Sequence, residues 1–77
     1  MQGVIIYTLP TCTWCDRAKD FLQKKGVVFE ERDISKSEEA RVKILSKTGQ
    51  LSVPVVEIRG ELIIGYDETK MTNALLA

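Results

Sequence analysis

Short apolar runs alternate with helical apolar stripes in the first part of the chain. Residues 4–7 form a continuous run of β-branched and aromatic side chains that stops before Pro10, which is typical of a buried central strand. In residues 13–25, apolar side chains recur every three or four positions, at Cys15, Ala18, Phe21 and Leu22. This spacing predicts an amphipathic helix with Cys15 on its apolar face, and Gly26 supplies a C-terminal stop.

A second strand and a second helix are predicted between residues 27 and 49. Residues 27–33 begin apolar and then become polar, as expected of an edge or near-edge strand. Ser35 and Glu38 have the spacing of a capping box, which predicts that a helix begins there, and Gly49 is the predicted end of this helix. The predicted inner stripe consists of Ala40, Ile44 and Leu45.

The last part of the chain predicts a hairpin followed by a short helix. Residues 55–58 and 61–64 are strand-like runs separated by a two-residue turn, which indicates an antiparallel hairpin. Asp67 is a suitable N-cap for a final helix. The apolar positions of that helix are Met71, Ala74 and Leu75.

The predicted order of elements, βαβαββα, belongs to the α/β class. Two strands joined through a helix are expected to be parallel, whereas the strands of a hairpin are antiparallel. We therefore expect a four-stranded mixed sheet flanked by three helices that cover both of its faces. Because functional groups gather beyond the carboxyl ends of parallel strands, the turn that holds Cys12 is the expected functional site.

Composition narrows the class of protein. The 77 residues fit one small domain spanning 1–77, and no apolar run approaches the roughly 18 residues of a membrane-spanning helix. The 11 basic and 11 acidic residues are interspersed, which argues against a nucleic acid or a membrane surface as partner. Because the first residues lack the features of a secretory signal, we expect a soluble protein in the cytoplasm.

The two cysteines, Cys12 and Cys15, form a Cys-x-x-Cys motif between the first strand and the first helix. A structural disulfide is disfavoured in the cytoplasm, so the pair is expected to be redox-active or to bind metal. A tetrahedral zinc site would lack two soft ligands because the chain has no histidine, although a dimer could share a site. Cys12 would lie at a helix N-terminus, where free N–H groups and the helix dipole favour a thiolate. Two cysteines used merely as small apolar residues are the remaining alternative.

Four features in a fixed order resemble a known family. They are the βαβαββα order, the Cys12-Thr13-Trp14-Cys15 motif after the first strand, Ser52-Val53-Pro54 before the third, and Ile64-Gly65-Tyr66-Asp67 after the fourth. Together they resemble the thioredoxin superfamily over nearly the whole chain, and the small size resembles a glutaredoxin-like redoxin. The resemblance implies a thioredoxin-like fold and a thiol–disulfide oxidoreductase.

The resemblance also implies roles for individual residues. Cys12 would attack a substrate disulfide as a thiolate and Cys15 would resolve the mixed disulfide, so the Cys12–Cys15 disulfide is the expected redox group and no bound cofactor is expected. Contacts to the substrate are implied for Thr11, Thr13, Trp14, Gln50, Ser52, Val53, Pro54, Gly65, Tyr66 and Asp67.

Two of these implied contacts lead to specific expectations. The position of Val53-Pro54 matches the cis-proline of the family, although an X-Pro bond considered from sequence alone is expected to be trans. Val53 would then offer its backbone to an extended substrate. Trp14 is expected to be a partly exposed aromatic that contacts an apolar side chain of a partner protein, the alternative being that it packs into the core.

The reductant is the least determined part of the expected function. Glutaredoxins that use glutathione carry cations and a Gly-Gly pair at the places occupied here by Leu9, Leu51 and Gly65-Tyr66. The missing cations argue against tight binding of glutathione. The Gly65-Tyr66 pair resembles the glycine-aromatic sequence of redoxins that supply ribonucleotide reductase, which implies protein disulfides as substrates and a flavoprotein thioredoxin reductase as reductant. One alternative is glutathione as co-substrate, with contacts from Gln50, Val53 and Asp67 and with Asp67 or Glu68 facing its amine. A dimer that shares a metal or iron–sulfur cluster is another alternative. A catalytically silent binding domain that keeps the fold is a further alternative. We expect the protein to be a monomer.

Overall fold

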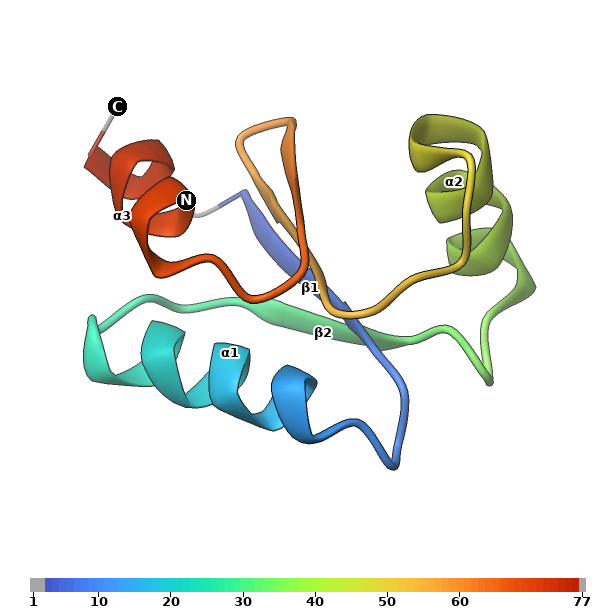
Figure 1. Cartoon of the computed structure of the whole chain (residues 1–77), viewed down its shortest axis with the longest axis horizontal. Helices are drawn as coiled ribbons and strands as arrows, with labels where there is room; N and C mark the ends of the chain where they lie inside the picture. Colours follow the sequence, from blue (N-terminus) through green and yellow to red (C-terminus); the bar gives the residue numbers. More distant parts are fainter. Residues whose placement is uncertain (1–2, 77) are drawn as a thin grey trace.

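In a computed structural model of the protein, which describes residues 3–76, four strands and three helices follow one another in the predicted order (Figure 1). The elements are β1 (Val4–Thr8), α1 (Thr13–Lys24), β2 (Glu30–Asp33), α2 (Glu38–Thr48), β3 (Val55–Ile58), β4 (Glu61–Ile64) and α3 (Glu68–Leu76). The order βαβαββα, the α/β class and the thioredoxin-like fold are therefore confirmed.

The sheet is mixed and has the strand order β2-β1-β3-β4. β1 lies in the interior and runs parallel to β2, as predicted for two strands joined through a helix. β3 is antiparallel to both β1 and β4. The carboxyl ends of β1 and β2 therefore lie at the same edge of the sheet, and the chain passes from that edge into α1.

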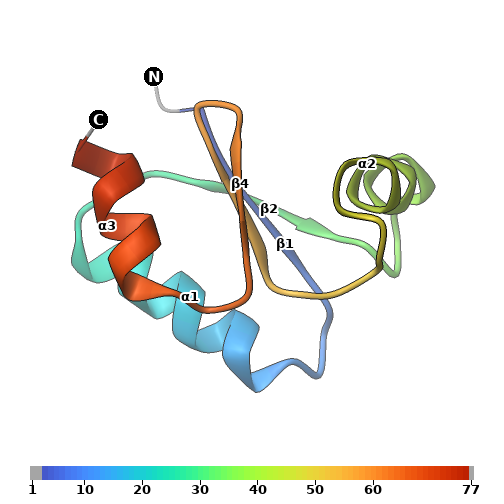
Figure 2. The same cartoon turned by 45° about the horizontal axis from the view of Figure 1, so that its top comes forward.

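The helices cover the two faces of the sheet unequally. α1 and α3 lie on one face and α2 lies on the other, as both views show (Figures 1 and 2). The core under α1 and α3 includes Ile6, Leu22 and Met71, all fully buried, and the core under α2 includes Tyr7 and Ile44. Because both faces are covered, β1 is almost entirely apolar rather than alternating in polarity.

Helix α1 has the predicted apolar face. Cys15, Ala18 and Leu22 are fully buried against the sheet, and Phe21 is partly buried. The helix ends at Lys24 with Lys25 as its C-cap, and Gly26 follows with a left-handed backbone, φ 73°. There the N–H of Gly26 donates to the carbonyl of Gln23 and the N–H of Val27 donates to that of Leu22, which is the Schellman arrangement.

The predicted start of the second strand is wrong. β2 begins at Glu30, and residues 27–29 precede it. The N–H of Val27 is already bonded to the carbonyl of Leu22, so this segment closes the helix instead of pairing with β1. Val27 and Phe29 pack against the core while Val28 is 72% exposed. The apolar character of Val27 and Phe29 therefore reflects packing against the core and not pairing in the sheet.

The predicted capping box is also wrong, because α2 is capped by Ser37. Its hydroxyl accepts a hydrogen bond of 3.1 Å from the N–H of Ala40. Ser35 instead donates its N–H and its hydroxyl to Asp33, at 2.8 and 2.6 Å, in a turn that ends β2. Glu38 is the first helical residue, so it lies too early to reach back to a cap.

The inner stripe of α2 is narrower than predicted. Ala40 and Ile44 are buried, but Leu45 is 50% exposed. Successive residues of a helix differ by about 100° in direction, so a residue directly after Ile44 turns away from the sheet. Gly49 ends α2 with a left-handed φ of 79°, as predicted.

The last three elements agree with the sequence. β3 and β4 form the predicted hairpin, and Arg59 and Gly60 turn the chain with φ of 50° and 90°. Asp67 accepts a 3.0 Å hydrogen bond from the N–H of Lys70, so it caps α3. No helix within residues 3–76 is long and apolar enough to cross a membrane.

Candidate functional site

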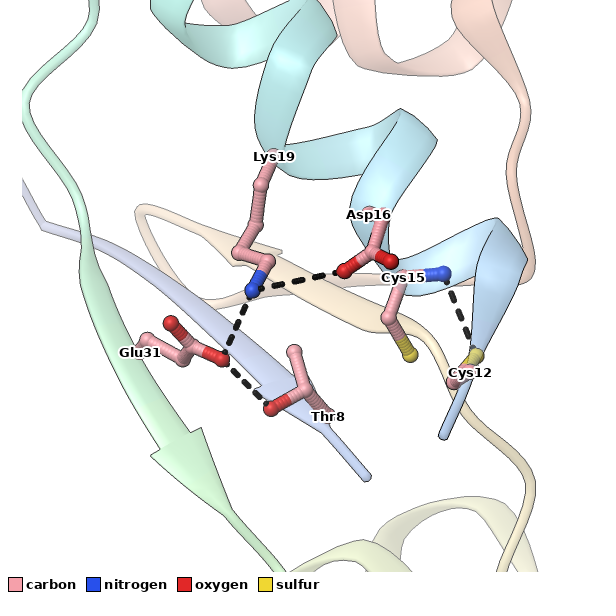
Figure 3. Close-up of polar contacts among 6 residues, drawn as sticks. All are labelled: Thr8, Cys12, Cys15, Asp16, Lys19 and Glu31. Atoms are coloured by element: carbon pink, nitrogen blue, oxygen red, sulfur yellow. Dashed lines mark hydrogen bonds and ion pairs between the residues drawn. The ribbon is translucent and has the colours of Figure 1, made fainter. Parts of the chain in front are cut away.

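Cys12 lies where the chain passes from β1 into α1. It is the N-cap residue of α1, with an extended backbone, and its carbonyl accepts the first helical hydrogen bond from the N–H of Asp16 at 3.2 Å. Its sulfur accepts a hydrogen bond from the N–H of Cys15 at 3.1 Å (Figure 3). The sulfur thus takes the place of a capping oxygen, where the helix dipole favours negative charge.

The two thiols differ in accessibility. Cys12 is partly exposed, whereas Cys15 is fully buried on the inner face of α1, and both are free. Burial raises the pKa of the Cys15 thiol to about 12, and its side-chain hydrogen bond with Cys12 adds to the shift. A backbone hydrogen bond at Leu9 lowers the pKa by a smaller amount. At neutral pH, Cys15 therefore holds its proton while Cys12 faces solvent.

A polar network lies beside the motif at the end of β1. The hydroxyl of buried Thr8 donates to Glu31 at 2.9 Å, and Lys19 donates to the same carboxylate oxygen at 3.0 Å (Figure 3). Lys19 also lies 3.6 Å from Asp16. The hydrogen bond from Lys19 lowers the pKa of Glu31, and the same bond raises the pKa of Lys19. Through Lys19, about two helical turns after Cys12, this network ties α1 to β1 and β2.

Sequence reasoning missed this network. A signal was present, because Thr8 is a polar residue directly after the apolar run and Glu31 lies in the strand predicted to pair with it. Nothing in the spacing indicated that Lys19 would reach them, since its contacts depend on how α1 crosses the sheet.

The Val53-Pro54 peptide is cis, as the family resemblance implied and the sequence alone did not. Pro54 is buried, and its carbonyl accepts a hydrogen bond of 2.8 Å from the N–H of Gly65. This bond joins the segment before β3 to the segment after β4. Both segments meet the first turn of α1 at a groove of about 240 Å³ lined by Trp14, Val53, Pro54, Gly65 and Tyr66.

Trp14 is 54% exposed, so it does not pack into the core. Its ring lies against that of Tyr66 with 5.8 Å between centroids, and the Arg17 guanidinium lies 5.0 Å from the Trp14 ring centre. Sequence reasoning did not single out Arg17. Its position three residues after Trp14 was the available signal, since such pairs are neighbours on a helix surface.

The other residues with implied substrate contacts do not line this groove. Thr11 and Thr13 are exposed beside the cysteines, and Ser52 is partly buried. Gln50 is exposed, with its backbone bonded to the Thr48 hydroxyl. Asp67 uses one carboxylate oxygen to cap α3.

The places where a glutathione-binding cation was expected hold apolar side chains. Leu9 packs beside the core under α2, and Leu51 is 49% exposed. The described part of the chain, residues 3–76, contains no group of three or more His, Cys, Asp or Glu side chains arranged to hold a metal ion.

Comparisons with known proteins agree with this geometry. The sequence profile of the glutaredoxin family matches residues 4–63. Glutaredoxin 3 of Escherichia coli K12 is 38% identical over 74 residues, which are 96% of this chain and 89% of that protein.

Two solved structures are also similar. The crystal structure of the glutaredoxin grx-1 from Archaeoglobus fulgidus has a TM-score of 0.88 and 34% identity, covering 100% of this chain and 89% of that one. The glutaredoxin-like NrdH-redoxin of E. coli, described as having a thioredoxin-like activity profile, has a TM-score of 0.81 and 25% identity, covering 95% of this chain and 93% of that one.

Proposed function

Because the chain belongs to the glutaredoxin family of thiol–disulfide oxidoreductases, we propose that it reduces protein disulfides with Cys12 as nucleophile and Cys15 as resolving thiol. The observation that carries the proposal is the difference between the two sulfurs. Cys12 is partly exposed and accepts a hydrogen bond at a helix N-terminus, whereas Cys15 is fully buried behind it. A substrate disulfide can therefore approach Cys12 but not Cys15.

The proposed reaction has two exchange steps. The Cys12 thiolate attacks one sulfur of the substrate disulfide, an S–S bond to Cys12 forms, and the other substrate sulfur leaves as a thiolate and takes up a proton. Cys15 then loses its proton and attacks the Cys12 sulfur, and the second substrate sulfur leaves. The dithiol has given two electrons to the substrate, and Cys12 and Cys15 are joined as a disulfide.

The helix N-terminus supports the first step. The N–H of Cys15 points at the Cys12 sulfur, and negative charge on that sulfur is favoured by the dipole of α1. Burial supports the order of the two steps, because the protonated Cys15 thiol cannot compete for an incoming disulfide. It attacks once the mixed disulfide has formed on its neighbour.

We assign reduction of the oxidised protein to a flavoprotein thioredoxin reductase, which passes on two electrons from NADPH. Leu9 and Leu51 offer no cation to the carboxylates of glutathione, and the Gly65-Tyr66 pair has a side chain where glutathione users have open backbone. Glutathione is the alternative reductant, with Asp67 or Glu68 facing its amine. The protein works as a cytoplasmic monomer in this proposal, since a dimer that covered Cys12 would obstruct exchange.

One pair of assays tests the activity and the reductant together. Reduction of a protein disulfide such as that of insulin is followed with NADPH plus thioredoxin reductase, and in parallel with glutathione plus glutathione reductase and NADPH. We expect turnover in the first assay and slow turnover in the second. Comparable rates would contradict the assigned reductant, and no turnover in either assay would contradict the oxidoreductase. The variant Cys12→Ser is the control for thiol-dependent turnover.

A further inference from the structure

The two outer strands of the sheet differ in how well their edges are protected. β2 consists of four charged residues, and charge is a common protection of a sheet edge against pairing with another chain. β4, at the other edge, has three apolar residues and a single charge, at Glu61, and it contains no proline. The edge at β4 is therefore the one that is open to a further strand.

The pattern of the hairpin shows which backbone groups of β4 face outward. Ile58 and Glu61 flank the two-residue turn, so they form a hydrogen-bonded pair, and such pairs alternate along an antiparallel ladder. The N–H and C=O groups of Leu62 and Ile64 therefore point away from β3. No backbone hydrogen bond from a turn, loop or cap reaches residues 61–64 in the described part of the chain. A further strand could thus bond to these outward groups.

A groove of about 330 Å³ follows this edge between β4 and α3. Its lining consists of the four residues of β4 together with Lys70 and Asn73 of α3. Ile64 is 48% exposed there, whereas Ile63 is buried in the core under α1 and α3. An exposed apolar side chain beside unpaired backbone groups is the arrangement that a pairing strand covers.

A second copy of β4 is complementary to this edge. In an antiparallel pair with a two-fold axis at Ile63, Leu62 of one copy lies opposite Ile64 of the other, and the axis repeats this pair. Each pair exchanges two backbone hydrogen bonds, so this register uses the outward groups of both residues in both copies. The opposed apolar side chains are neighbours on the same face of the joined sheet.

The charges at the two ends of the groove are also complementary in this arrangement. Glu61 of one copy lies opposite Gly65 of the other, on the face that carries Ile63 into the core under α1 and α3. Lys70, in the first turn of α3, lines the groove on that same face. Neither Glu61 nor Lys70 forms an ion pair within residues 3–76. The axis brings the carboxylate of each copy to the ammonium of the other.

We propose that the open edge of β4 is a self-association site, at which two copies of the chain pair their β4 strands antiparallel and join their sheets. The contact is a strand of four residues, far smaller than the roughly 1,200–2,000 Å² interfaces of stable complexes. The association is therefore weak and reversible. The dilute protein remains the monomer of the proposed function, and the dimer forms as its concentration rises.

Sedimentation equilibrium of the protein in a thiol reductant tests this proposal, because the reductant excludes dimers joined through Cys12. We expect the weight-average mass to rise about 1.5-fold between about 10 μM and 1 mM protein, as for a dissociation constant of about 1 mM. The amide NMR signals of residues 61–65 should shift over the same range. A constant monomer mass would overturn the proposal, and so would association without shifts at these residues, since another surface would then be responsible.

Charge reversal tests the register of the pair. Glu61→Lys and Lys70→Glu each place like charges opposite one another and should weaken association by about threefold or more, whereas the double variant should restore it. Both residues are exposed, so the variants should keep the fold. Val28→Lys is the matched control, since Val28 is 72% exposed and does not line this groove. Failure of the double variant to recover association would overturn the arrangement about Ile63.

Discussion

The N–H of Cys15 donates a hydrogen bond to the sulfur of Cys12 across 3.1 Å. One peptide group thereby links the accessible thiol to the buried one, because the residue that supplies the N–H also supplies the second sulfur. The backbone of α1 makes this link, because Cys12 is the N-cap residue and its sulfur therefore lies over the N–H of the residue three positions later. The two cysteines are consequently fixed relative to each other before any disulfide forms.

Substitution of Cys15 should trap the first exchange step. In Cys15→Ser, Cys12 still attacks a disulfide but the resolving thiol is absent, so a covalent adduct should accumulate and be detected by mass spectrometry of the intact protein. Cys12→Ser is the matched control and should form no adduct under the same conditions, because the remaining sulfur is buried. Adduct formation on Cys15 at a similar rate would contradict the assignment of Cys12 as nucleophile.

The stability of the reduced protein should fall at alkaline pH. The pKa of the Cys15 thiol is about 12 in the folded protein against 9.0 for the unperturbed thiol, so the unfolded chain binds fewer protons than the folded one between these values. The free energy of unfolding therefore decreases as pH rises from 9 towards 12 and is unaffected by this group below 9. Urea unfolding at several pH values in this range measures how steeply the free energy of unfolding falls with pH. In Cys15→Ala this fall should be shallower. Identical slopes would contradict the raised pKa.

Removal of the Lys19 cation should change the titration of Glu31. The hydrogen bond from Lys19 is the main cause that lowers the pKa of Glu31 from 4.5, so Lys19→Met should move this pKa upward. The lowered pKa stabilises the fold above about pH 4.5, and this stabilisation is lost as pH falls through the folded value. NMR titration of the Glu31 side chain reads the shift directly.

Lys24→Met is the control for the Lys19 variant. Lys24 pairs with Asp20 at 3.0 Å on the exposed side of the same helix, so its loss removes an equal charge from α1. It should leave the titration of Glu31 nearly unchanged. Equal shifts in the two variants would show a general effect of charge on α1 rather than the contact with Lys19.

Two leucines should respond very differently to truncation. Leu22 is fully buried between α1 and the sheet, so Leu22→Ala should lower the free energy of unfolding by about 2–5 kcal/mol. Leu45 is 50% exposed, so Leu45→Ala should change the free energy of unfolding by less than about 0.5 kcal/mol. Urea unfolding of both variants checks the pair, and a large loss from Leu45→Ala would contradict its placement on the outer side of α2.

Local sequence patterns predicted the elements that depend on local chemistry. The helical stripe containing Cys15 and Leu22, the cap at Asp67 and the end at Gly26 all rest on groups within a few residues of one another. The predictions were wrong where the local sequence fits two different structures. Ser35 and Ser37 are both suitable caps, and the outcome followed from the bond that Ser35 makes to Asp33. Residues 27–29 look like a strand, but the N–H of Val27 is used by the end of α1.

By itself, the sequence determined that an amphipathic helix begins at a Cys-x-x-Cys motif with one sulfur at its N-terminus and the other on its apolar face. It did so because the spacing of apolar side chains and the chemistry of helix ends act over only a few residues. Tertiary structure decided the surroundings of those sulfurs. The cis Val53-Pro54 segment, the contact between Trp14 and Tyr66, and the bonds of Thr8 and Lys19 to Glu31 join residues that are far apart in the chain. Such contacts depend on how the helices cross the sheet, which no local pattern contains.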